Sequence, residues 1–422
     1  MGAFDIDSVS AREILDCRLE PTLRVTVETA AGSGTADVPA GRSTGRNEAR
    51  ERRDGDDRYA GKGVRDAVAA VEDDLTAAVD GMDVRDQRAI DRVLAERAGP
   101  NKEALGGNAT TGVSLAVLKA AADNAAVPLY RAVGGAGAHT LPAPVLDYVE
   151  GGELAATDLA FQEHQAVPVG ADSFSEAIRW GAEVYAELGD RLAAEWGASA
   201  RNVGVEGGYT PAGMTDPRDA FDAILAAVEE CGYGGEFVLS IDAAATHFFD
   251  SEAAVYRVAG QEYDREAMLD LYADLCGAYP LASIEDPLQE ADFEGFAAAT
   301  DRLDCQIVGD DLFVTQVERV QRGIDAGAAN ALLLKVNQVG TVTEALDAAE
   351  TATGAGYAVQ VSERSGQTPD TWLADLAVGL DAGQIKTGVT RGERVEQYNR
   401  LLEIEADAAT TYGGDVLAGD RP

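Results

Sequence analysis

The stretch ALLLKVNQVG, residues 331–340, decides the fold of this chain. Four apolar residues run directly into Lys335, and the sequence then turns polar. A short apolar run that stops at a charged residue is typical of a buried strand that ends in a loop. The chain has only five lysines, so a lysine at this position indicates a specific need for an amine: Lys62, Lys102, Lys119, Lys335 and Lys386.

The same pattern recurs from residue 141 onward, where short apolar runs alternate with longer helical ones. Strands that alternate with helices predict a mostly parallel sheet covered by helices. Eight or so repeats in about 280 residues favour a closed β/α barrel, and the closeness of the first two runs indicates an antiparallel start. The predicted strand segments are APVLDYV, FQEHQAVPV, RNVGVEGGY, FVLSIDAA, LASIEDP, CQIVGDD, ALLLKVNQ, YAVQVSERSG and QIKTG.

The first third of the chain has a different organisation. Residues 5–38 read as strands, since LRVTVETA alternates apolar and polar side chains, and residues 62–133 read as helices. The segment GGAGAHTLPAP, residues 134–144, is a glycine- and proline-rich break. We therefore predict an α/β protein with an N-terminal α+β domain over 1–137 and a catalytic β/α barrel over 138–422.

The composition excludes several classes of function. The chain has 74 acidic and 34 basic residues, a formal net charge of −40, which repels nucleic acid and anionic membranes. Its hydrophobic content of 46% is ample for a core. Neither a signal peptide nor an apolar run of membrane-spanning length is present, and the four cysteines form no metal-binding pattern. We expect a cytoplasmic protein adapted to high salt.

Ionisable residues occur at the ends of many predicted strands. Because the carboxyl ends of barrel strands form one mouth, where active sites assemble, these residues are expected to converge. Three carboxylates around one point repel each other unless a hard cation lies between them, and oxygen-only ligands favour Mg²⁺. The converging residues are Glu163, Glu206, Asp242, Glu285, Asp310, Lys335, Glu363, Arg364 and Lys386.

Two lysines accompany the predicted metal ligands Asp242, Glu285 and Asp310. We expect the ammonium groups of Lys335 and Lys386, beside a dication, to lower each other's pKa and so to make one of them a base. Arginine could not take this role, because it stays protonated.

These residues lie in motifs that resemble the enolase family almost from end to end. Enolases have an N-terminal α+β capping domain on a β/α barrel with an antiparallel start, and they dehydrate 2-phosphoglycerate to phosphoenolpyruvate with Mg²⁺. The matching motifs include AREILDCRLEPT, GRSTG, NATTGVSLAV, QEHQAVPVGADSF, NVGVEGGYTP, SIEDP, LLLKVNQVGT and QIKTG.

The resemblance implies a role for each matching residue. Lys335 corresponds to the base, Glu206 to the general acid with Glu163 as its partner, and Lys386 to the lysine that grips the substrate carboxylate. One or two Mg²⁺ per subunit are implied, the first on Asp242, Glu285 and Asp310 and the second with Ser43. The residues expected to face substrate are Arg364, Ser365, Ser43, Gln162, Glu363 and Arg42.

The sequence departs from the family pattern around the substrate. Leu154 and Glu363 stand where enolases carry histidines, Val205 replaces an aspartate, and Cys17-Arg18-Leu19-Glu20 replaces Ser-Arg-Gly-Asn. Glu363 repels a phosphorylated substrate unless a cation such as Arg42 or Arg46 pairs with the phosphate or with Glu363.

Three interpretations follow. We favour an enolase-like lyase with an altered carboxylate substrate, phosphorylated or not. The alternatives are a genuine glycolytic phosphopyruvate hydratase with an unusual pocket, and a non-catalytic scaffold derived from an enolase. The family also implies a homodimer or homo-octamer.

Overall fold

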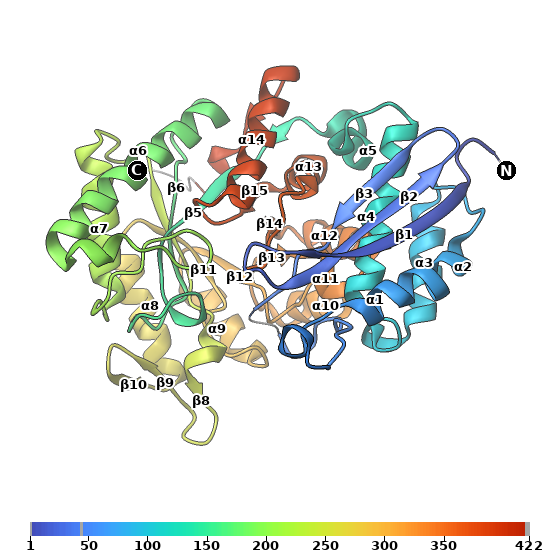
Figure 1. Cartoon of the computed structure of the whole chain (residues 1–422). Coiled ribbons are helices and arrows are strands. Elements are labelled where there is room, and N and C mark those ends of the chain that lie inside the picture. The colour runs from blue at the N-terminus through green and yellow to red at the C-terminus, as the bar shows by residue number, and fades with distance from the viewer. Residues whose placement is uncertain (1, 43–44, 418–422) are drawn as a thin grey trace.

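A computed structural model describes residues 2–42 and 45–417 (Figure 1). The N-terminal region contains an antiparallel sheet in the order β1 (Ile6–Leu15), β2 (Pro21–Thr29) and β3 (Ser33–Asp37). One face of this sheet packs on α4 (Gly107–Asn124), a helix of small residues that is buried over most of its length. Both elements agree with the strands and helices predicted for this part of the chain.

Further helices complete the N-terminal region. α1 and α2 are joined through one π-helical segment, Ala70–Leu75, so that residues 65–79 form one nearly continuous helical stretch. The bounds are α1 (Arg65–Ala69), α2 (Thr76–Val79), α3 (Gln87–Ala98) and α5 (Leu129–Gly134).

The rest of the chain forms a closed barrel of strands, in the order β11, β12, β13, β14, β15, β5, β6 and β7. β6 runs antiparallel to both β5 and β7, while the other neighbours are parallel. The predicted α/β barrel with an antiparallel start is thus confirmed. The bounds are β5 (Ala143–Glu150), β6 (Glu163–Val167), β7 (Val238–Asp242), β11 (Leu281–Glu285), β12 (Gln306–Gly309), β13 (Ala331–Leu334), β14 (Ala358–Ser362) and β15 (Gly383–Lys386).

Helices surround the barrel, and two small sheets lie outside it (Figure 1). The helices are α6 (Phe174–Trp196), α7 (Pro217–Glu230), α8 (Arg265–Ala278), α9 (Phe293–Arg302), α10 (Val317–Ala326), α11 (Val336–Val339), α12 (Val342–Gly354), α13 (Trp372–Gly379) and α14 (Gly392–Asp407). The outlying strands are β4 (Thr140–Leu141) with β16 (Thr411–Tyr412), and β8 (Phe249–Asp250), β9 (Val255–Val258) and β10 (Gln261–Tyr263).

One predicted strand, RNVGVEGGY at residues 201–209, is wrong. This segment is a loop with isolated bridges at Val203 and Tyr209, and the barrel closes without it. Three glycines in nine residues weaken a strand, and Gly207 adopts a left-handed conformation with φ of 98°. Glu206 therefore lies on a loop and not at a strand end.

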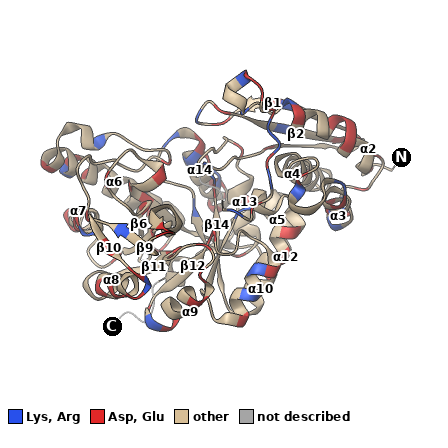
Figure 2. Ribbon diagram, turned by 90° about the horizontal axis from the view of Figure 1, so that it is seen from below, with Lys and Arg blue, Asp and Glu red and all other residues tan. Residues whose placement is uncertain are grey.

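Acidic residues are spread over helices of both the N-terminal region and the barrel (Figure 2). Within residues 2–42 and 45–417, no helix combines the length and the apolar character needed to cross a bilayer.

Candidate active site

Lys386, the last residue of β15, lies at the centre of the barrel mouth. Its Nζ is 2.9 Å from Asp242 Oδ2, 2.8 Å from Glu285 Oε2 and 3.0 Å from Glu163 Oε1. These carboxylates come from the ends of β7 and β11 and the start of β6, which is antiparallel, so all three face the same mouth. The predicted convergence is present for this group.

Lys335 follows β13 and pairs with Asp310, its Nζ lying 2.5 Å from Oδ2. The other oxygen of Asp310 accepts a hydrogen bond from Gln338 Nε2 at 2.8 Å. Gln338 lies on α11, the single turn that directly follows Lys335, so the motif LLLKVNQ supplies both groups that hold this carboxylate. The Lys335 side chain remains 13% exposed, which gives it access to a bound ligand.

Lys386 does lower the pKa of Lys335, as expected, but this effect is outweighed, and among the described side chains the pKa values of both lysines are raised. Burial alone would lower the pKa of each ammonium group. The ion pair with Asp310 outweighs burial and raises the pKa of Lys335, and Asp242, Glu163 and Glu285 raise that of Lys386 well above its usual range. A dication that competes for these carboxylates would remove the cause of both shifts.

Asp242, Glu285 and Asp310 fit a hard cation by the chemistry of their donors. All three are at least nine-tenths buried, and Glu285 Oε1 has no hydrogen-bond partner among the described residues. Gln162 donates to Asp242 at 3.1 Å and so orients it. The ammonium groups of Lys335 and Lys386 contact these carboxylates in this structure. The carboxylate oxygens become available to a metal when the two lysine side chains move away.

A second cluster of carboxylates includes Glu163, which Lys386 contacts. Oxygen atoms of Asp147, Glu163 and Glu206 lie within 4.8 Å of one another, and all three residues are buried. Glu150 is next to them, and its Oε1 accepts hydrogen bonds from the backbone N–H of Glu206 at 3.0 Å and of Gly208 at 2.6 Å. Glu150 thus fixes the loop that carries Glu206.

Burial and repulsion from neighbouring carboxylates make Glu150 and Glu163 hard to ionise. Burial, with Glu206 next in importance, raises the pKa of Glu150 to about 8. Burial also raises the pKa of Glu163 to about 8, although Lys386 opposes this shift. Such values favour groups that hold a proton near neutral pH, which suits proton donation.

Glu363, the residue after β14, is neutralised by an arginine that the sequence did not indicate. Arg394 on α14 forms an ion pair with Glu363 Oε2, and both side chains are buried. Thr387 donates a further hydrogen bond to the same oxygen at 3.2 Å. The expected pairing of Arg42 or Arg46 with Glu363 is wrong, because Arg394 takes that place, while the alternative pairing with a phosphate stays a prediction.

Arg394 also connects the positions that depart from the family pattern. Its guanidinium donates to the carbonyl oxygens of Val205 at 3.2 Å, Arg364 at 3.2 Å and Ser365 at 3.0 Å. The backbone N–H of Val205 in turn donates to the carbonyl of Leu154 at 3.2 Å. Leu154, Val205 and Glu363 therefore form one connected group and not three isolated changes.

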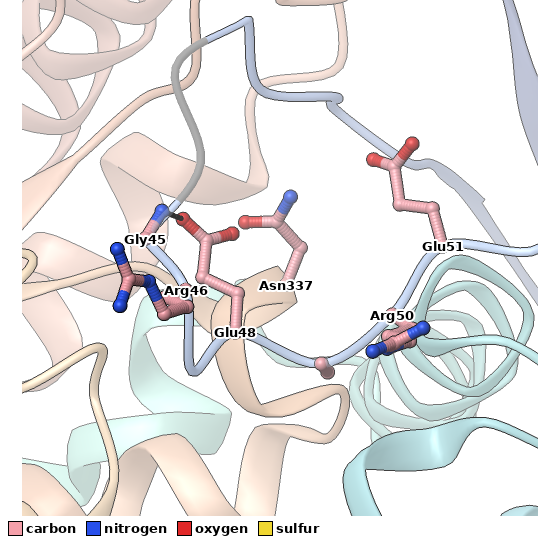
Figure 3. A pocket seen from close by; sticks show the side chains of 7 residues that line it. Gly45, Arg46, Glu48, Arg50, Glu51 and Asn337 are labelled. Atoms are coloured by element: carbon pink, nitrogen blue, oxygen red, sulfur yellow. Dashed lines mark hydrogen bonds between the residues drawn. The ribbon is translucent and has the colours of Figure 1, made fainter.

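Arg364, the residue after Glu363, contacts the loop that follows Ala40. Its guanidinium binds Glu48 through two hydrogen bonds of 2.8 and 3.1 Å and Asn337 at 3.0 Å. Figure 3 shows the Glu48 carboxylate directed toward Asn337, with the backbone N–H of Gly45 donating to it. A pocket of about 390 Å³ beside the Arg364–Glu48 pair is lined by Gly45, Arg46, Glu48, Ala49, Arg50, Glu51 and Asn337.

The remaining predicted substrate residues lie around the same mouth. Ser365 is buried next to Arg364, and Arg42 lines a neighbouring pocket with Arg18, Arg53 and Lys62. Ser43 lies outside the described residues. Arg46 has an exposed side chain 3.3 Å from Glu290.

Sequence comparisons agree with this geometry. Residues 6–133 match the family model for the enolase N-terminal domain, and residues 138–418 match that for the enolase C-terminal TIM barrel domain. The chain belongs to the enolase family. The family places it among the carbon–oxygen lyases.

Full-length relatives are similar throughout. The enolase of Methanopyrus kandleri is 54% identical over 411 residues, 96% of each chain. That of Pyrococcus furiosus is 51% identical over 424 residues, 99% of this chain and 98% of the relative. The enolase of Methanocaldococcus jannaschii is 50% identical over 415 residues, 97% of each chain.

Proposed function

We propose that this lyase dehydrates 2-phosphoglycerate to phosphoenolpyruvate. The observation that carries the proposal is the placement of two lysines, Lys335 and Lys386, among buried carboxylates at the carboxyl end of the barrel. Similarity to enolases over nearly the whole chain supports the same reaction. We therefore prefer 2-phosphoglycerate to the different carboxylate substrate that the sequence alone favoured.

In this proposal, Asp242, Glu285 and Asp310 hold Mg²⁺, which stabilises the negative charge of the enolate when bound. Lys335, in its amine form, takes the proton next to the carboxylate of the substrate. The electron pair left on that carbon forms the new double bond as the bond to the hydroxyl oxygen breaks. Glu206 gives its proton to the departing hydroxide, which leaves as water, and Glu163 assists.

The remaining side chains of the site bind and orient the substrate. Lys386 binds the carboxylate of the substrate, and this contact would draw the ammonium group away from Asp242 and Glu285. Arg364 and Ser365 bind the phosphate, together with Ser43, and the phosphate competes with Glu48 for the guanidinium. Gln162 and Arg42 complete the site.

The purified enzyme with Mg²⁺ and high KCl should convert 2-phosphoglycerate at rates typical of enzymes, about 1–10³ s⁻¹, followed by the absorbance of phosphoenolpyruvate. Lys335→Ala serves as the inactive control. Absence of turnover by well-folded, Mg²⁺-loaded protein would reject the proposal.

A second candidate function, elimination from a different carboxylate, is favoured by one observation. Glu363 puts a carboxyl where enolases carry a histidine, and its Oε1 has no hydrogen-bond partner among the described residues. If this candidate holds, Glu363→His should raise kcat/KM for 2-phosphoglycerate. If the first holds, the same change lowers it, because Arg394 then loses its counter-charge.

We also propose a cytoplasmic, glycolytic role and assembly as a homodimer or an octamer of dimers. The division at residues 137/138 likewise stays a prediction. Sedimentation at several KCl concentrations would test the assembly, and a monomer at all of them would contradict it.

A further inference from the structure

Asp147, on the inner side of β5, has no place in the proposed reaction. It is fully buried, and neither of its carboxylate oxygens has a hydrogen-bond partner among the described residues. Glu150 Oε2 is equally buried and also lacks a partner. A buried carboxylate without donors is strongly destabilising in its ionised form, so this group must either hold a proton or face a positive charge that the described side chains do not provide.

The neighbouring side chains add negative charge. One oxygen from each of Asp147, Glu163 and Glu206 lies within 4.8 Å of the others. The adjacent ammonium group, Lys386, contacts Glu163 but is shared with Asp242 and Glu285. Arg394, the other buried cation nearby, already pairs with Glu363. One shared ammonium group therefore faces a set of four carboxylates that includes Glu150.

We propose that Asp147, Glu163 and Glu206 form a binding site for a divalent cation, distinct from the one at Asp242, Glu285 and Asp310. Oxygen ligands of a hard cation at roughly 2.1–2.5 Å are separated by about 3–5 Å. The oxygen atoms of this set, all within 4.8 Å of one another, are close enough to share one cation. With oxygen donors alone, the site suits Mg²⁺, Mn²⁺ or Ca²⁺ and not zinc. Glu150 adds charge to the site from the side of the Glu206 loop.

This site goes beyond the proposed function and does not depend on it. A cation bound here keeps Glu206 ionised, whereas the elimination step needs Glu206 protonated. The site therefore belongs to the substrate-free enzyme, and the cation and the transferred proton exclude each other.

The test is calorimetric titration of the substrate-free full chain with Mn²⁺, with bound Mn²⁺ counted independently by electron paramagnetic resonance. Wild type should bind two Mn²⁺ per chain, because the ion that the family resemblance implies at Ser43 is held together with the substrate phosphate, which is absent from this titration. Asp147→Asn, which keeps the shape of the side chain, should bind one, and Glu285→Gln should retain the ion at Asp147. Asp91→Asn is a matched control, because Asp91 is also buried but is hydrogen-bonded to Gln87 and Thr343; it should bind two.

One Mn²⁺ in wild type, or two in Asp147→Asn, would overturn the proposal and leave protons as the charge that the cluster holds. Circular dichroism of each variant establishes that it is folded before the count is made. Turnover of 2-phosphoglycerate is measured separately, so a failure of the proposed function does not enter this result.

Discussion

Arg394 on α14 pairs with Glu363 after β14 in the interior of the protein, with side-chain exposures of 0% and 2%. The pair converts a change that would repel an anionic substrate into a neutral element of the site wall. It also ties Glu206, through the carbonyl of Val205, to the strand end that carries Arg364 and Ser365. The relative placement of the proposed acid and the proposed anion-binding residues thus depends on one buried ion pair.

Loss of Arg394 should be costly. Arg394→Met leaves Glu363 buried without its counter-charge, and breaking a buried pair in this way costs about 3–5 kcal/mol of the free energy of unfolding. Denaturant unfolding of Arg394→Met, Glu363→Gln and the double variant gives the coupling energy. Arg400→Met is the control, since Arg400 pairs with Asp375 but is 23% exposed and should cost less. Equal losses of unfolding free energy in Arg394→Met and Arg400→Met would contradict the special importance of the buried Arg394–Glu363 pair.

Lys335 should be required for removal of the substrate proton. Lys335→Ala is expected to slow exchange of that proton with deuterated solvent by about 10²–10⁴-fold, the usual contribution of a general base. Nuclear magnetic resonance of 2-phosphoglycerate in deuterium oxide measures the exchange. Lys119→Ala, which removes the 2.7 Å ion pair with Asp370, should exchange at the wild-type rate. Undiminished exchange in Lys335→Ala would assign the base elsewhere.

His164 should make the protein less stable in acid. It is fully buried between Phe161 and Phe221, and burial lowers its pKa to about 4. Between pH 4 and the ordinary value near 6.5, the unfolded chain binds the proton and the folded protein does not. Stability from this group is therefore fully present above pH 6.5 and is lost as the pH falls toward 4, by about 3 kcal/mol in total.

Comparison with a variant isolates this effect from the carboxylates. His164→Gln should flatten the rise of unfolding free energy with pH between 4 and 6.5, measured by denaturant titration at each pH. His139→Gln should leave the slope unchanged, because His139 is exposed. Identical slopes in all three proteins would mean that His164 titrates normally.

The strand ends made much of the fold and part of the site predictable from the sequence. Lys335, Lys386 and the predicted metal ligands each follow or end an apolar run, and barrel geometry brings such ends together. Glu163 instead begins β6, which reaches the same mouth because it runs antiparallel to its neighbours. Asp147 and Glu150 were missed because they lie inside the apolar run APVLDYVE, where a single acidic residue reads as solvent-facing. Arg394 was missed because an arginine on an amphipathic helix is usually exposed. Only tertiary packing distinguishes these cases.

Leu19 should be a site where glycine increases stability. Its φ of 62° lies in the left-handed region, and its side chain is 75% exposed, so it gains little from packing. That conformation costs about 1–2 kcal/mol for a residue with a side chain, and the extra freedom of glycine in the unfolded chain offsets about 0.4–1 kcal/mol of this. Leu19→Gly should thus stabilise by up to about 1 kcal/mol. Leu15→Gly, at an exposed position of strand β1, should destabilise, and denaturant unfolding distinguishes the two.

The net charge of −40 should make stability depend on salt. Repulsion between exposed acidic groups opposes the folded state, and its range falls from about 10 Å at 0.1 M salt to about 3 Å at 1 M. The thermal midpoint should therefore rise as KCl increases through this interval. A variant with Glu72, Asp73 and Asp74 changed to their amides, on an exposed part of the π-helical segment, should rise less. A midpoint that does not change with KCl would contradict adaptation to a high-salt cytoplasm, whereas a continued rise above 1 M, where screening is nearly complete, would point to hydrated cations held by the acidic surface.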